Sequence, residues 1–177
     1  MKAVTLWPEW AWAILHLDKR HENRGWQPPE SLHGERLALH AGKTIGGGEE
    51  KPAEAFEAVV GMAERAGWDV TRAGDGYRFE KDDRVVTLGS LSEIVTGSIV
   101  GTVVLSGAPV PGVRVPWGVP GQWAWPLRDV SALRHPIPHR GALGLWQVPD
   151  AVAGVVLSAA ASSCRPTSTP KTPKEVR

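Results

Sequence analysis

The sequence predicts an α+β fold, a mixed or antiparallel β-barrel with short helices at its sides. Three observations lead to this class. Many short segments alternate apolar with polar residues or are rich in β-branched residues, which is typical of strands. Only two or three segments repeat apolar residues at helical spacing. Finally, 20 glycines and 15 prolines divide the chain into closely spaced turns, as is typical of barrels and sandwiches.

The first 41 residues alternate between strand and helix. We expect strands at 2–7, 21–26 and 34–41, a helix at 8–18 and a loop at 27–33. Pro8 occupies the first position of the helix, where proline is tolerated because the N–H there has no helical partner. The strand at 34–41 is the clearest, since Leu37 and Leu39 alternate with more polar or smaller residues.

Residues 49–90 form a variable, acidic segment within the predicted domain. A glycine-rich turn at 45–50 precedes an amphipathic helix at 52–66, in which apolar residues recur at helical spacing. Short strands are expected at 69–71, 77–81 and 84–88. Residues 49–90 carry ten acidic and six basic side chains, so we expect this segment to lie away from any site for a phosphate.

The second half of the chain supplies the longest strands. The expected elements are strands at 97–106, 122–133 and 143–148, a Pro/Gly loop at 107–121 and an apolar helix at 150–161. Gly101 interrupts the first of these strands and indicates a bulge or a tight bend. We assign residues 1–161 to one domain, and residues 162–177, rich in Ser, Thr, Pro and Lys, to a disordered basic tail.

Charge and composition narrow the classes of function. The net charge is only +1, whereas general duplex binding draws on many phosphate contacts. No apolar run is long enough for a membrane span, and Glu9 interrupts an N-terminus that otherwise starts like a signal peptide. The single cysteine fits a reducing compartment. We therefore expect a cytoplasmic protein without membrane contact or cofactor. We also expect no metal, because prolines between His135 and His139 prevent a helix that would align them.

Three stretches resemble a known family. They are TLWPEWAWAILHLDKRHENRGW at 5–26 followed by GERLALHAGK at 34–43, GSIVGTVVL at 97–105, and PWGVPGQWAWPLRDVSALRHPIPHRGALGLWQVP at 116–149. In this order they resemble the ASCH domain of phage and bacterial genomes, within the PUA-like superfamily. The resemblance implies a PUA-like barrel, and relatives with that fold bind RNA or modified bases. Some ASCH proteins are ribonucleases, and one bacterial branch hydrolyses acetylated cytidine.

Lys19, Glu22 and Arg24 are the leading candidates for a site. If the helix ends at Lys19 and the next residues are extended, Glu22 and Arg24 project from the same strand face. Arginine can bind a phosphate or a base edge, and a carboxylate can accept from an exocyclic amine or shuttle a proton. In an enzyme, Lys19 and Glu22 would be the catalytic pair. The alternative is a solvated ion cluster that contributes little.

Histidine, lysine and tryptophan side chains complete the candidate set. The resemblance places the end of the 34–41 strand near the cleft, which makes His40 and Lys43 candidates for ligand binding, and His40 also for acid–base chemistry. His40 could equally form hydrogen bonds inside the barrel. Trp10, Trp26 and Trp117 are candidates for stacking a base. The alternative for each is a place in the core, or, for Trp117, a lid on the barrel mouth.

Three hypotheses for function are open. The leading one is a nucleic-acid binding module that recognises RNA, single-stranded nucleic acid or a modified nucleotide in a small cleft. The second is a ribonuclease or a hydrolase of modified nucleosides that uses the same cleft. In the cytidine-hydrolysing branch a threonine stands where this chain has Glu22, so that particular activity is not carried over. The third is a phage-type accessory protein that binds a host protein through residues 49–90.

Overall fold

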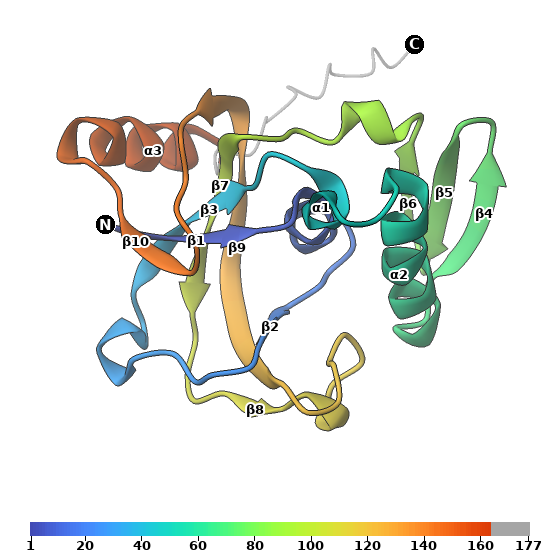
Figure 1. Ribbon diagram of the computed structural model, residues 1–177, viewed down its shortest axis with the longest axis horizontal. Coiled ribbons are helices and arrows are strands. Elements are labelled where there is room, and N and C mark those ends of the chain that lie inside the picture. Colours follow the sequence, from blue (N-terminus) through green and yellow to red (C-terminus); the bar gives the residue numbers. More distant parts are fainter. Residues whose placement is uncertain (164–177) are drawn as a thin grey trace, which may run out of the picture.

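A seven-stranded sheet, strongly curled into a half-barrel, forms the centre of the computed structural model, which describes residues 1–163 (Figure 1). Its strands are β1 Lys2–Leu6, β2 His21–Arg24, β3 Arg36–Ala41, β7 Ser98–Leu105, β8 Val110–Pro111, β9 Trp123–Pro138 and β10 Leu145–Gln147. They lie in the order β10–β1–β3–β7–β9–β2, and β8 pairs with β9. β1 and β3 are parallel, and the other pairs are antiparallel. The mixed α+β class and the barrel-like curvature predicted from the sequence are confirmed.

The pairing of β7 with the long strand β9 contributes to this curvature. Their register shifts twice, between Ile99 and Gly101 and between Thr102 and Val104, and such bulges bend and twist a strand. Gly101 is required here, because a Cβ atom at this position would lie 2.7 Å from the carbonyl oxygen of Ser131. The bulge that Gly101 indicated in the sequence is therefore confirmed.

The strand β9 runs to Pro138, five residues beyond the predicted end at 133. Pro136 and Pro138 cannot donate to a ladder, because proline has no backbone N–H. The chain nevertheless rejoins β7 after a short interruption, with Ile137 opposite Ile99 and Pro138 opposite Ser98. This extension carries the residues that follow β9 to the end of β3, where they enclose one side of a cleft described below.

Helix α1 Pro8–His16 lies between the curled sheet and the helix formed by residues 52–65 (Figure 1), and it packs into two hydrophobic cores. Ala11 and Ile14 pack into the core of the curled sheet. Ala13 and Leu17 pack into a second core, built largely from residues 56–94. The helix ends two residues before the predicted end at 18, because Asp18 takes the left-handed conformation with φ 57°.

The second core belongs to the acidic segment. Helix α2 Pro52–Arg65 packs beside a three-stranded antiparallel sheet of β4 Asp69–Ala73, β5 Gly76–Lys81 and β6 Arg84–Leu88. Trp12 of α1 makes ring contacts with Phe56 and Phe79 of this unit. An ion pair between Arg84 and Asp18 joins β6 to the residues that follow α1. The predicted helix and three strands are all present, and they share their core with α1.

Helix α3 Asp150–Ser163 covers the other side of the sheet, away from α2 in Figure 1. Val156 and Ala160 pack against Ile99 and Leu133. The helix extends two residues beyond the predicted end at 161, and the rest of the predicted tail lies outside the described residues. Within residues 1–163, no helix is both long and apolar enough to cross a membrane.

Candidate functional site

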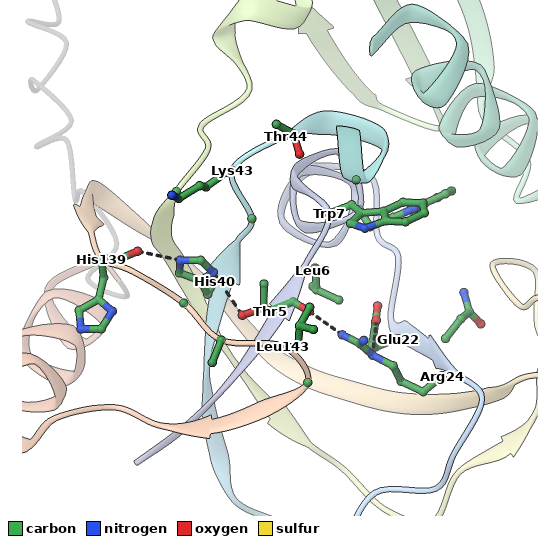
Figure 2. A pocket seen from close by; sticks show the side chains of 18 of the residues that line it. Thr5, Leu6, Trp7, Glu22, Arg24, His40, Lys43, Thr44, His139 and Leu143 are labelled. Atoms are coloured by element: carbon green, nitrogen blue, oxygen red, sulfur yellow. Dashed lines mark hydrogen bonds and ion pairs between the residues drawn. The ribbon is translucent and has the colours of Figure 1, made fainter. Parts of the chain in front are cut away.

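A cleft of about 920 Å³ opens where β1 ends and α1 begins. Its walls are the first turn of α1, the strand β2, the end of β3 and the loops around residues 42–47, 119–122 and 139–144. Six of the eight candidate residues line it, namely Trp10, Lys19, Glu22, Arg24, His40 and Lys43. Figure 2 shows Glu22 and Arg24 at one end and His40 and Lys43 toward the other.

Lys19, Glu22 and Arg24 form one connected network at the floor of the cleft. The Lys19 Nζ lies 3.4 Å from Glu22 Oε2 and donates to the carbonyl oxygen of His21. The Nε of Arg24 lies 3.0 Å from Glu22 Oε1, and its Nη2 donates to the carbonyl oxygen of Thr5 at 2.6 Å. Lys19 is only 1% exposed and Glu22 only 6%, so this is not the solvated ion cluster that was the alternative.

The local chain conformation explains how these three groups meet. The left-handed turn at Asp18 reverses the chain, and Arg20 and Arg84 both pair with its carboxylate. The strand β2 then places Glu22 and Arg24 on one face, as the spacing of two residues predicted. Asn23, which also lines the cleft, holds the loop that follows Trp117: its amide donates to the carbonyl oxygen of Trp117 and accepts from the N–H of Val119.

The lysine of the network has an altered acidity. Burial lowers the pKa of Lys19 from the usual 10.5, because the charged ammonium loses solvation. The charge of Glu22 and its hydrogen bond oppose this effect, and the charge of Arg24 adds to it. A buried amine with a lowered pKa is more available as a proton acceptor than an exposed lysine.

His40 has partners for both of its ring nitrogens. Nε2 lies 2.9 Å from the carbonyl oxygen of His139, which can only accept, so Nε2 carries the proton. Nδ1 lies 3.3 Å from the Thr5 hydroxyl, which itself accepts from the indole N–H of Trp146. Burial lowers the pKa of His40 and favours this neutral form. In this arrangement His40 fastens the loop 139–144 to the end of β3.

Lys43 and Arg140 supply exposed positive charge at this end of the cleft. Both line the cleft and are solvent-exposed, and neither forms an ion pair within residues 1–163. Lys19 and Arg24 are partly balanced by Glu22, so the lining carries a net positive charge. Such a lining attracts an anion.

Trp26 and Trp117 are not among the residues that line the cleft. Trp117 is buried in the second core, and Trp26 packs edge-to-face on Trp125 with ring centroids 4.7 Å apart. Trp10 does line the cleft, with Lys19 Nζ 5.8 Å from its ring centroid.

Sequence reasoning missed Trp7, which also lines the cleft and is 51% exposed. A signal was present, because Trp7 precedes Pro8 at the helix N-cap, where Ser, Thr, Asp or Asn is usual. Its side chain makes no capping hydrogen bond.

No cluster of three or more His, Cys, Asp or Glu side chains in the described part of the chain could hold a metal ion. No protein-family model matches this sequence, and a comparison with curated proteins also finds no match.

Proposed function

We propose that the cleft binds a nucleotide, either free or as part of single-stranded RNA. The observation that carries this proposal is the buried Lys19–Glu22–Arg24 network, which opens into a cleft whose unpaired charges are cationic. Buried charges are costly to desolvate, and the retention of two of them, Lys19 and Glu22, beside the half-buried Arg24 at a cleft is typical of a functional site.

The dimensions and the charge of the cleft support a nucleotide over other anions. A volume of about 920 Å³ lies within the usual range for small-molecule sites. The network supplies both donors and an acceptor, which suits the edge of a base, and Lys43 and Arg140 suit a phosphate. A net charge of +1 does not favour a broad electrostatic surface for duplexes.

We further propose that the chain is an ASCH domain with a PUA-like fold. The three stretches that resemble the family all contribute to one cleft, through residues 5–24, 40–43, Gly97 and 119–144. The curled mixed sheet is consistent with this assignment.

Titration tests the binding proposal. We expect the wild-type protein to bind mononucleotides saturably, and the variants Lys43→Ala and Arg140→Ala to bind about tenfold more weakly each, the scale of one charge-assisted hydrogen bond. Arg114→Ala is the matched control, because Arg114 is exposed but not part of the cleft. Absence of saturable binding by the wild type to both mononucleotides and single-stranded RNA would overturn the proposal.

A second candidate is an enzyme, a ribonuclease or a hydrolase of modified nucleosides. The buried position of Lys19 beside Glu22 favours it, because burial lowers the pKa of the amine and makes proton transfer through this group easier than for an exposed lysine. Incubation with RNA and with modified nucleosides would reveal turnover by product analysis. In this case Lys19→Met, which keeps the length of the side chain without the amine, should abolish turnover while the melting temperature shows that the fold persists. Turnover by Lys19→Met equal to that of the wild type would exclude Lys19 as the base.

A further inference from the structure

We infer that Trp7 is the surface on which the ligand stacks an aromatic base, so that the cleft selects nucleotides over sugar phosphates and inorganic phosphate. This inference rests on the proposed function and adds the chemical class of the ligand at one end of the cleft.

The Trp7 ring is exposed to solvent in the cleft. All nine tryptophans lie within the described residues, and only Trp7 and Trp10 line the cleft. Trp7 is 51% exposed, whereas Trp10 is half-buried and already close to the Lys19 ammonium. A large ring left half open to solvent in a cleft is not explained by packing of the core.

The turn around Gly47 supports one side of the Trp7 ring. A Cβ atom at Gly47 would lie 3.0 Å from both Cε2 and Nε1 of Trp7 and 3.1 Å from Cζ2. The backbone of Gly47, which has φ 67°, therefore packs directly against the indole. This turn is itself fixed, because the N–H of Gly46 donates to the buried carboxylate of Glu9 at 3.1 Å. The indole is thus held on one side by backbone.

The other side of the Trp7 ring faces the part of the cleft that holds Glu22. Figure 2 shows the Trp7 ring across the cleft from Glu22 and Arg24, with the Glu22 carboxylate directed toward the space below the ring. A base stacked on Trp7 would have its edge near this carboxylate, which can accept from N–H groups of the base. Aromatic rings hold unpaired bases in this way without a sequence requirement.

The other exposed tryptophan provides a control within the same chain. Trp26 is 42% exposed, close to the value for Trp7, but it packs on Trp125 and is not part of the cleft. Removing the Trp26 ring measures the effect of losing exposed aromatic surface in general. Removing the Trp7 ring measures, in addition, the effect of losing a stacking surface in the cleft.

The experiment compares GMP with ribose 5-phosphate, which carries the phosphate and sugar without a base. We expect Trp7→Ala to weaken GMP binding about five- to 150-fold, the effect of losing one stacked base, and Trp7→Phe to stay within about threefold of the wild type. Trp26→Ala should bind GMP like the wild type. The weaker binding of ribose 5-phosphate should be the same in Trp7→Ala and the wild type, which also shows that the cleft remains folded.

Two results would overturn the inference. One is unchanged GMP binding by Trp7→Ala. The other is an equal loss of GMP and ribose 5-phosphate binding in Trp7→Ala, which would mean that Trp7 only shapes the cleft. Failure of the wild type to bind any mononucleotide is a different result, because it would reject the proposed function itself.

Discussion

Glu9 is a buried carboxyl group with incomplete hydrogen bonding. It is 1% exposed, its Oε1 accepts from the N–H of Gly46, and its Oε2 has no hydrogen-bond partner within residues 1–163. Burial raises the pKa of Glu9 above the usual 4.5, and the charge of Glu50 adds to this, while the hydrogen bond from Gly46 opposes it. The group that supports the glycine turn behind Trp7 therefore also makes the fold sensitive to pH.

Replacing Glu9 with glutamine should remove this sensitivity. Because the pKa is raised in the folded state, the folded protein retains a proton that the unfolded chain loses above about pH 4.5, and stability falls as the pH rises through this window. Glu9→Gln should therefore gain stability relative to the wild type as the pH rises, because glutamine has no proton to lose. Thermal melts of both proteins at about pH 4 and about pH 8 measure this gap. A gap that narrows toward the higher pH would contradict the assignment.

Some residues of the site could be placed from the sequence, and others could not. The spacing of Lys19, Glu22 and Arg24 was enough to predict their convergence, because a helix end followed by a strand has only a few local geometries. Tryptophan could not be placed in the same way. Trp117 lies in a Pro/Gly loop, which suggested exposure, but residues 56–94 build a core that buries it. A contact between residues so far apart in the chain leaves no pattern in the sequence around Trp117.

The loop 139–144 depends on a close approach between Gly141 and His40. A Cβ atom at Gly141 would lie 2.4 Å from Cε1 and 2.5 Å from Nδ1 of the His40 ring, and this ring is fixed by Thr5 and by the His139 carbonyl. The loop forms one wall of the cleft. A substitution at Gly141 should therefore alter the cleft by displacing the loop 139–144, and not by removing a contact with the ligand.

Gly141→Ala should destabilise the fold by about 1–3 kcal/mol, the usual cost of overpacking, and should weaken any ligand binding in the cleft. Gly154→Ala is the control in α3, where a new Cβ meets no atom within 4 Å, and it should stabilise by about 0.5–1 kcal/mol because alanine favours a helix. Chemical denaturation gives both values. Equal stability of Gly141→Ala and the wild type would mean that the loop moves freely away from His40.

The elements themselves were largely predictable. The strand at 36–41 and the helix at 52–65 follow their periodic patterns closely. The end of β9 was not predictable, because the residues around Pro136 and Pro138 pair with β7 only through a bulge in the ladder. The two-residue strand β8 also carries no pattern, since its pairing with Ala124 and Trp123 depends on tertiary structure.

At the scale of the molecule, α1 couples two cores. Its residues pack into the curled sheet on one side and into the unit of α2 and β4–β6 on the other. The acidic composition of residues 49–90 predicted a segment away from the cleft, and none of its residues lines the cleft. Its side chains Phe56 and Phe79 are fully buried in the second core. Composition describes the solvent-facing side of this unit and does not describe its core.

Truncating a side chain in the second core should therefore lower both the stability of the fold and the affinity of the cleft for its ligand. Phe79→Ala should cost about 3–5 kcal/mol of unfolding free energy, and it should also weaken ligand binding because Phe79 contacts Trp12 on α1. Val156→Ala, in the core beneath α3, should destabilise without an effect on binding. Binding by Phe79→Ala equal to the wild type at a temperature where both are folded would show that the two cores are uncoupled.

Whether the cleft binds a nucleotide can be tested by an NMR titration of the wild-type protein with GMP, followed through the indole N–H resonances of the nine tryptophans, assigned by substitution. We expect a saturable shift of the Trp7 indole resonance together with the backbone amides of Glu22, Arg24, Lys43 and Arg140, while the Trp26 indole resonance stays in place. Saturable shifts confined to other parts of the molecule, or no saturable shift at all, would contradict nucleotide binding in this cleft.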